Sequence, residues 1–213
     1  MPKRFDHRTR LPSSSLLGLF LGLALLLQPL GGARAHPHVW IDVSVVLRFQ
    51  ENVLEGLRVV WLFDEYYSAF AVQDFDVNGN KRLDPEELAI LVNSHDGLKD
   101  YSYFTHLKVG DLLPENLRVE VVENFTAEMN GDRLQYAFDV PLPENLDPRK
   151  TTFGIGFYDE TYYIDLSVGS SRKLRVTGNW PSGCRPALVE DKLNPIYFGM
   201  INPLYVQIGC DVS

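Results

Sequence analysis

The sequence predicts an α+β protein: a mainly antiparallel, sandwich-like β domain with an EF-hand-like helix–loop–helix insertion after its second strand. Three observations support this prediction. Apolar and polar side chains alternate over residues 39–49, which indicates a half-buried strand. The spacing then becomes helical on both sides of a polar loop at 74–87. After Pro114 the alternation with a period of two returns, so further strands follow the insertion.

The first 35 residues have the pattern of a secretory signal. An apolar run at 16–27 ends shortly before Ala33-Arg34-Ala35, a small–x–small cleavage site. Such a run is too short to span a bilayer comfortably, although an uncleaved membrane anchor is the alternative interpretation. The basic residues that precede the run are Lys3, Arg4, Arg8 and Arg10. We therefore expect residues 36–213 to be a single exported β-rich domain that does not span the membrane after cleavage.

The chain is acidic, with 20 Lys and Arg against 28 Asp and Glu and a formal net charge of −8. Cleavage after Ala35 would remove five basic residues and one acidic residue, which leaves 15 against 27 and a net charge of −12. Such a surface repels nucleic acid, and no basic patch with interleaved aromatic residues offsets the repulsion. The negative charge favours cations as ligands. Because it repels phosphate groups, we expect no nucleic-acid partner.

The first two strands come directly before the insertion. Val39–Phe49 places six apolar side chains on one face, and after a turn Leu57–Phe63 alternates again. Helical spacing through Tyr66–Ala71 leads into the polar loop, and Leu88–His95 repeats on one helix face at i, i+3, i+4 and i+7. We therefore place the EF-hand-like helical insertion at residues 64–100.

Residues Asp76–Glu87 carry the oxygen pattern of a calcium-binding EF-hand loop. Such a loop supplies oxygens from positions 1, 3, 5, 7, 9 and 12, because Ca²⁺ takes about six to eight oxygen ligands. An alternative register from Asp74 would put Pro85 at position 12, where a carboxylate is needed, so we prefer the register from Asp76. The predicted ligands are Asp76, Asn78, Asn80, the backbone carbonyl of Arg82, Asp84 through a water, and Glu87.

Lys81 occupies the sixth position of this loop, where glycine is usual. The turn requires φ > 0 there, which costs roughly 1–2 kcal/mol for a residue with a Cβ, and the ammonium group opposes the ion. Three ligands are anionic and no second EF-hand is evident, so we expect weak binding, with a Kd of about 10⁻⁴–10⁻³ M. A metal-free helix–turn–helix is the alternative, because Asp84-Pro85-Glu86-Glu87 is also a strong helix start with a capping box.

The second half of the chain predicts further strands. Asn130-Gly131 is a strong hairpin signal between the first two of them, and we interpret Asp159-Glu160 as the turn of another hairpin. The last 35 residues are rich in Pro, Gly and Asn, and we expect them to be irregular with short strands. The predicted strands are, in chain order, 119–129, 134–140, 153–157, 162–168 and 174–176.

Cys184 and Cys210 are the only cysteines of the chain. In an oxidising compartment such a pair predicts a disulfide, which would stabilise the fold by roughly 3–4 kcal/mol in the chain-entropy model. A soft-metal site is the alternative, but no other Cys and no nearby His joins the pair.

Signal cleavage after Ala35 would make His36 the first residue, in the sequence His36-Pro37-His38. A free α-amine, the His36 imidazole and a second imidazole form a set of three nitrogens suited to copper, zinc or nickel. The amino-terminal copper motif that uses the amide of residue 2 is excluded, because Pro37 has no N–H. His106 lies in an aromatic segment and is a candidate remote third ligand. A solvated terminus without metal is the alternative.

Five segments of the chain form a pattern: HPHVWID at 36–42, FDEYYSAF at 63–70, the loop at 76–87, DYSYFTHLKV at 100–109 and YDETYYIDL at 158–166. In this order they resemble a bacterial family known as domain of unknown function 1007. The resemblance covers most of 36–170 and implies a periplasmic component of an uncharacterised ABC-type transport system, with a link to nickel and cobalt exporters. Members of the family commonly have Gly at the sixth loop position, so Lys81 departs from the family pattern.

We therefore expect a non-catalytic, periplasmic metal-binding protein. Calcium would brace the insertion, while the amino-terminal histidines would capture or pass a transition metal for a membrane metal transporter. No nucleophile elbow, reactive thiol or phosphate-binding glycine loop is evident, so the sequence does not indicate an enzyme. Two alternatives stay open: a calcium-stabilised adhesion or partner-binding module, and a copper oxidative enzyme that uses the amino-terminal His36.

Overall fold

The longest alternating stretch of the sequence forms an inner strand of the larger sheet. In β1 (Val39–Gln50) the six odd-numbered side chains from Val39 to Phe49 are buried, and the side chains between them are exposed or half-buried. One face of the strand therefore joins the core, as the alternation predicts. The computed structural model describes residues 37–110, 118–168 and 174–210, all within the unit His36–Ser213, so the predicted signal at 1–35 lies outside the described residues.

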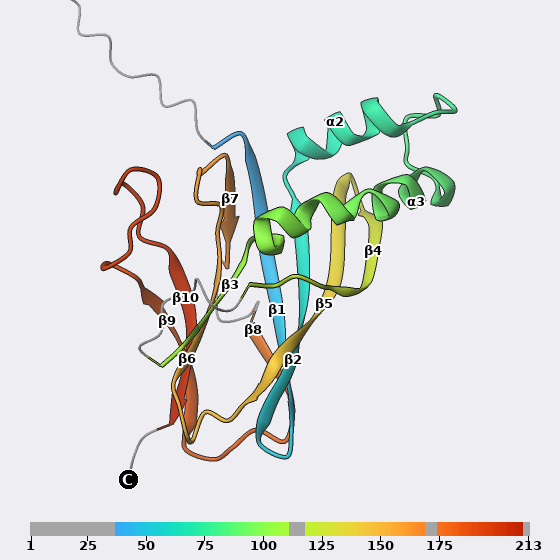
Figure 1. Cartoon of the computed structure of the whole chain (residues 1–213). Helices are drawn as coiled ribbons and strands as arrows, with labels where there is room; N and C mark the ends of the chain where they lie inside the picture. The colour runs from blue at the N-terminus through green and yellow to red at the C-terminus, as the bar shows by residue number, and fades with distance from the viewer. Residues whose placement is uncertain (1–36, 111–117, 169–173, 211–213) are drawn as a thin grey trace, which may run out of the picture. The chain divides into compact units, whose positions relative to one another are not determined.

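The described residues form two mostly antiparallel sheets and three helices, which confirms the α+β class (Figure 1). The six-stranded sheet contains β1, β2 (Val53–Phe63), β4 (Glu123–Asn130), β5 (Arg133–Leu146), β7 (Ile164–Ser167) and β8 (Leu174–Gly178). The four-stranded sheet contains β3 (Thr105–Val109), β6 (Phe153–Phe157), β9 (Cys184–Glu190) and β10 (Leu204–Cys210). The helices all follow β2: they are α2 (Glu65–Phe75), α3 (Pro85–Asn93) and the 3-10 helix η1 (His95–Phe104).

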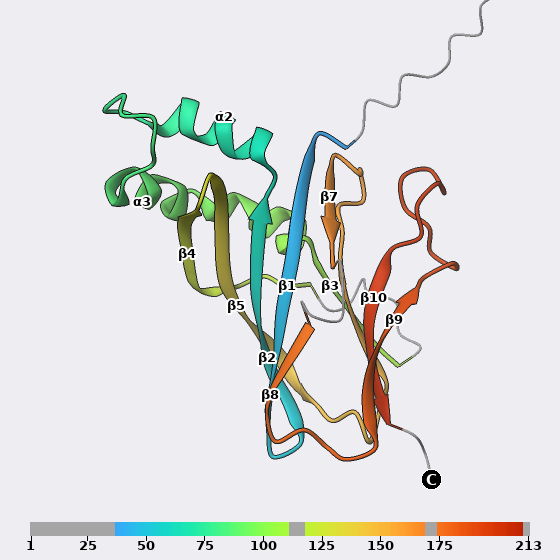
Figure 2. The ribbon, with the colours of Figure 1, turned by 180° about the vertical axis from the view of Figure 1, so that it is seen from behind.

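β1 has hydrogen-bonded neighbours on both of its edges. Antiparallel β2 lies on one side. On the other side two short strands run parallel to β1, β7 beside Val39–Asp42 and β8 beside Val45–Phe49 (Figure 2). Gly178 ends β8 with a φ of +84°, and a Cβ there would lie 1.7 Å from the Phe49 carbonyl oxygen. Only glycine fits where the chain leaves this close strand pair.

The predicted hairpin of residues 153–157 with 162–168 is wrong. β6 lies between β3 and β10 in the four-stranded sheet, whereas β7 belongs to the six-stranded sheet. The turn between β6 and β7 therefore carries the chain from one sheet to the other. Both segments alternate, but alternation identifies a strand without identifying its partner. The hairpin predicted at Asn130-Gly131 is confirmed, because β4 and β5 pair on either side of it.

Asp64 attaches the helical insertion to β1. Its carboxylate accepts the N–H of Trp40 (2.8 Å) and the N–H groups of Tyr66 (2.8 Å) and Tyr67 (3.0 Å) at the start of α2. One side chain thus caps the helix and fixes its direction relative to the sheet. Ser68, which is completely buried, donates to the Asp64 carbonyl (2.6 Å) and accepts a backbone N–H from β5 (2.9 Å).

The apolar faces of the two sheets share one hydrophobic core. Trp61 packs edge-on against Phe138 in the six-stranded sheet, with ring centroids 4.9 Å apart. Ile155 of the four-stranded sheet belongs to the same cluster, and Ala71 and Leu91 extend it to α2 and α3. These two helices lie beside β4 and β5 at one end of the six-stranded sheet (Figure 1). No helix among the described residues is long and apolar enough to cross a membrane.

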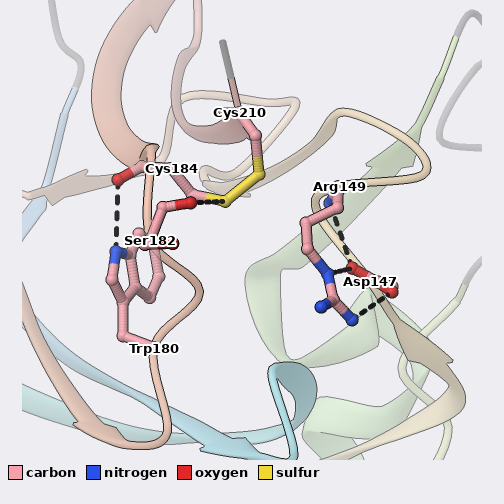
Figure 3. The surroundings of a disulfide bond; sticks show 6 residues. All are labelled: Asp147, Arg149, Trp180, Ser182, Cys184 and Cys210. Carbon is pink, nitrogen blue, oxygen red and sulfur yellow. Dashed lines mark hydrogen bonds and ion pairs between the residues drawn. A yellow bond between two sulfur atoms is a disulfide. The ribbon is translucent and has the colours of Figure 1, made fainter. Parts of the chain in front are cut away.

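The predicted disulfide joins Cys184 to Cys210 (Figure 3). It links the first residue of β9 to the last of β10, which are opposite each other in the antiparallel register. The Trp180 indole N–H donates to the Cys184 carbonyl (3.1 Å) beside it. The tail is more regular than the sequence predicts, since β9 and β10 are seven-residue strands. β10 has apolar residues of its own, and Tyr205, Val206 and Ile208 are buried against the core, so the Pro, Gly and Asn content of the tail conceals a regular strand pair.

Replacing both cysteines by serine should lower the free energy of unfolding by about 3–4 kcal/mol, because the link closes a loop with a sequence separation of 26 residues. Urea denaturation of the oxidised proteins measures this loss. Reducing the native protein should reproduce the loss and leave the double variant unaffected. An unchanged denaturation midpoint in the double variant would contradict the stabilising role.

Candidate functional site

The loop between α2 and α3 is wrapped around the carboxylate of Asp76. Its Oδ1 accepts the N–H groups of Gly79 (2.8 Å) and Asn80 (3.1 Å), and its Oδ2 accepts the N–H of Lys81 (2.6 Å). Three consecutive backbone donors thus point at the first predicted calcium ligand. Such a nest of N–H groups stabilises the negative charge of the side chain and fixes the first half of the loop.

Three further predicted ligands meet at one oxygen atom. The Nδ2 groups of Asn78 and Asn80 both donate to Asp84 Oδ2, at 2.9 Å and 2.8 Å. Their Oδ1 atoms accept backbone N–H groups two residues further along the chain, at 3.0 Å and 2.9 Å. The second of these donors is Arg82, whose carbonyl is the predicted ligand at position 7. The loop therefore gathers polar side chains from positions 3, 5 and 9 at a single point.

Glu87 closes the loop from its far end. Its side chain is buried, with 4% exposure, and Oε1 accepts the N–H groups of Val77 (2.8 Å) and Asn78 (3.2 Å). Oε2 accepts the N–H of Asp84 (2.8 Å), which is the return bond of the predicted capping box. One carboxylate thus connects the start of the loop to the start of α3.

The left-handed conformation expected at Lys81 is confirmed, with a φ of +65°. The turn therefore has the backbone that an EF-hand loop needs at its sixth position, although the residue has a Cβ. Among the residues that the structure describes, no group of three or more His, Cys, Asp and Glu side chains could hold a metal ion. The predicted calcium ligands of this loop include the amide oxygens of Asn78 and Asn80 as well as carboxylates.

His38 lies at the beginning of β1, and His36 lies outside the described residues. The N–H of His38 donates to the Tyr163 carbonyl (2.9 Å), and its exposed ring packs on the Tyr163 ring with centroids 4.8 Å apart. His38 is thus attached to Tyr163, the residue just before β7.

His106 lies on β3, opposite Gly156 of β6. Its ring is stacked on Tyr158, with centroids 3.7 Å apart and planes at 6°, and its Nε2 donates to the Tyr158 carbonyl (3.0 Å). A carbonyl only accepts, so the neutral imidazole keeps its lone pair on Nδ1. Burial lowers the pKa of His106 below its ordinary value, and the charge of Arg118 acts in the same direction. Glu160 and the Tyr158 carbonyl act against this shift of the pKa without reversing it.

Asp159 holds the turn that lies between these two histidines. Its buried carboxylate accepts the N–H groups of Thr161 (2.9 Å), Tyr163 (3.1 Å) and Ile164 (3.1 Å). His106 contacts the residue before this aspartate, and His38 contacts the residue before β7, so both sit against one turn. The sequence pattern predicts a turn at Asp159 but does not indicate this structural role. Its only signal is a threonine two positions further on, the spacing of an Asx turn.

Stability should fall as the pH drops below about 6.5, because the folded protein holds His106 with a lowered pKa. The unfolded chain then binds a proton that the folded protein resists, so the stabilisation present at pH 7 is lost toward lower pH. The variant His106→Gln keeps a donor for the Tyr158 carbonyl but does not titrate. Urea denaturation at several pH values from 7 down to about 5 should show a flatter profile for this variant. If the free energy of unfolding changed equally with pH in the native protein and in His106→Gln, the lowered pKa of His106 would be contradicted.

Comparison with known proteins places the chain in a family. The family described as "Protein of unknown function (DUF1007)" matches residues 21–206. An "Uncharacterized protein" of Haemophilus influenzae is 27% identical over 184 residues, which cover 85% of this chain and 82% of that protein. An "Uncharacterized 15.5 kDa protein in trpE 3'region" of Spirochaeta aurantia is 35% identical over 140 residues, which cover 64% of this chain and 96% of that protein. The resemblance found in the five sequence segments is confirmed, and the chain belongs to the DUF1007 family.

Proposed function

We propose that this protein is an exported, non-catalytic metal-binding protein, in which Ca²⁺ at Asp76–Glu87 braces the helical insertion. One observation carries the proposal: the polar side chains at positions 1, 3, 5, 9 and 12 of a single loop are bonded to one another or to the loop backbone. A loop that already gathers these groups needs little rearrangement to surround an ion, so little ordering entropy opposes binding.

The hydrogen bonds of the loop are compatible with an ion. Each carboxylate oxygen has two lone pairs, so Asp76 Oδ2 and Glu87 Oε2, which each accept one N–H, can still coordinate a cation. The Nδ2–H groups of Asn78 and Asn80 are the positively polarised partners that donate to Asp84 Oδ2 in the structure. Ca²⁺ would take over as the positive partner of this carboxylate.

The chemistry of the donors favours calcium over softer ions. All predicted ligands are oxygens, which hard cations prefer, and three of them are carboxylates. Lys81 brings a positive charge into the loop, and its left-handed backbone is unfavourable for a residue with a Cβ. We therefore expect a Kd of about 10⁻⁴–10⁻³ M, in the range of extracellular calcium modules.

A transition metal near the amino terminus forms the second part of the proposal. His38 and His106 contact residues of the same turn, Tyr163 and Tyr158. An Nε2–H bonded to a backbone carbonyl orients an imidazole so that Nδ1 can act as a metal ligand. In the cleaved protein His36 would add its imidazole and the α-amine, a set suited to copper, zinc or nickel. The earlier resemblance to a transport-system component makes a membrane metal transporter the expected partner.

Calcium at about ten- to hundredfold above Kd should stabilise the cleaved protein by about 1.4–2.7 kcal/mol. Replacing Glu87 by Gln should abolish this increment, because the last carboxylate ligand is lost. Differential scanning calorimetry with and without calcium measures the increment, and Mg²⁺ at equal ionic strength controls for salt. The matched control is Glu86→Gln, which removes an exposed charge next to Glu87 and should leave the increment intact. An equal increment in Glu87→Gln and the native protein would overturn the calcium site.

Zinc binding by the exported, cleaved protein should weaken at least about tenfold when one residue is added before His36, because the α-amine moves away from the imidazole. Competition with a weak zinc chelator measures the affinity. His38→Gln and His106→Gln should each weaken binding, whereas His95→Gln, on the helical insertion, should not. Identical affinity in the extended protein would exclude the amino-terminal site.

A further inference from the structure

A cleft of about 770 Å³ opens beside the turn that follows β6. Three segments that are distant in sequence line it: residues 100–106 at the junction of η1 and β3, residues 158–161, and residues 194–197 between β9 and β10. Arg118 lines it as well. The volume falls in the range of small-molecule sites, which are usually concave and built from several segments. Neither the calcium loop nor the disulfide belongs to this cleft.

Aromatic rings form part of the walls of the cleft, beside polar and charged residues. Tyr101 is stacked on Phe104, with ring centroids 5.5 Å apart, and His106 is stacked on Tyr158 at 3.7 Å. The Tyr158 hydroxyl forms a hydrogen bond with the Tyr205 hydroxyl (2.9 Å), which holds this wall in position. Stacked, anchored rings offer a large apolar surface that loses little side-chain entropy when a flat ligand packs against it.

Arg118 provides a positive charge that is held in place by neutral groups. Its Nε donates to the Ser102 hydroxyl (3.1 Å), and one of its terminal nitrogens donates to the Asp100 carbonyl (2.9 Å). Within the described part of the chain no carboxylate pairs with it. The guanidinium has five N–H donors in a fixed fork, so it keeps donors for a bound carboxylate.

The other charged groups of the cleft limit what can bind. Asp159 uses its carboxylate to hold its own turn and, among the described residues, forms no ion pair with Arg118, although it keeps its negative charge. Asp100 and Glu160 are exposed at the cleft and carry negative charge. These carboxylates and the acidic character of the whole chain oppose ligands with several negative charges, such as nucleotides. A ligand with one carboxylate suits the single arginine.

Strained backbone is concentrated around the cleft. Ten described residues other than glycine have positive φ, and six of them lie on the three segments or in the adjoining turn. They are Ser102, Tyr103, Phe104, Tyr162, Tyr197 and Phe198. Conformations of this kind are costly for residues with a Cβ and tend to occur where a binding surface requires them. Three of them, Ser102, Phe104 and Tyr197, line the cleft.

We propose that this cleft binds a small organic molecule with one carboxylate and a flat, apolar or aromatic body. Arg118 receives the carboxylate, and the rings of Tyr101, Phe104 and Tyr158 pack against the body. This site is separate from the proposed calcium site, because no calcium ligand lines it. His106, a candidate ligand of the proposed transition-metal site, belongs to the cleft wall, but Arg118 and not this histidine receives the carboxylate. The calcium proposal can therefore fail while the cleft proposal holds, and Arg118→Gln tests the cleft without changing a proposed metal ligand.

Three indole compounds of similar size test the anchor: indole-3-propionate, its neutral amide and tryptamine. Isothermal titration calorimetry should detect saturable binding of indole-3-propionate, and weaker binding or none for the other two. Arg118→Gln should weaken the binding of indole-3-propionate at least about tenfold, because a charge-assisted hydrogen bond is lost. Arg175→Gln, which removes an exposed arginine from β8, is the matched control and should bind as the native protein does.

Two more variants separate binding from folding. Arg118→Lys keeps the charge but not the planar fork, so it should bind with an affinity between those of the native protein and Arg118→Gln. Tyr101→Ala removes a wall residue that is 58% exposed, and it should weaken binding several-fold without changing the melting temperature. Equal affinity for the propionate and its amide, or native affinity in Arg118→Gln, would overturn the proposal. So would the absence of saturable binding by benzoate, cinnamate and indole-3-propionate up to about 10 mM.

Discussion

The pairing of β1 on both of its edges is the constraint from which the rest of the fold follows. The N–H and C=O groups of a buried strand must form hydrogen bonds, because each buried backbone group without a partner costs about as much free energy as a lost hydrogen bond. β2 satisfies one edge after a short turn, while β7 and β8 satisfy the other and run parallel to β1. Parallel neighbours cannot be reached by a tight turn. The chain therefore crosses to the four-stranded sheet before it returns, and the crossing creates the turn at 158–163.

Two aspartate side chains fix the conformation of the segments that connect the strands. Asp64 bonds to β1 and to the first turn of α2, so the insertion starts in a fixed direction. Asp159 does the same for the crossing turn, which brings His38 and His106 to one element. In both cases a carboxylate accepts several backbone N–H groups and so fixes the start of an element. Asp64 and Asp159 thus act as structural clamps.

Glu87 shows how one residue can begin a helix and close a loop together. Its carboxylate caps α3 at the Asp84 N–H and also holds the start of the loop at Val77. The sequence presents these two roles as competing interpretations. In the fold the helix cap and the closure of the loop occur together, because one oxygen of Glu87 caps α3 and the other accepts the N–H groups at the start of the loop. An ion would add to this arrangement and need not replace it.

The sequence by itself determined the features that depend on neighbouring residues. The buried face of β1, the turn at Asn130-Gly131, the left-handed Lys81 and the return bond of Glu87 all follow from local spacing and backbone sterics. The pairing of Cys184 with Cys210 follows from there being only two cysteines. Tertiary structure alone decided which strands are partners, so it overturned the hairpin of β6 with β7. It also decided that Arg118 meets the aromatic segments near residues 104 and 158, since no periodicity encodes contacts between residues so distant in the chain.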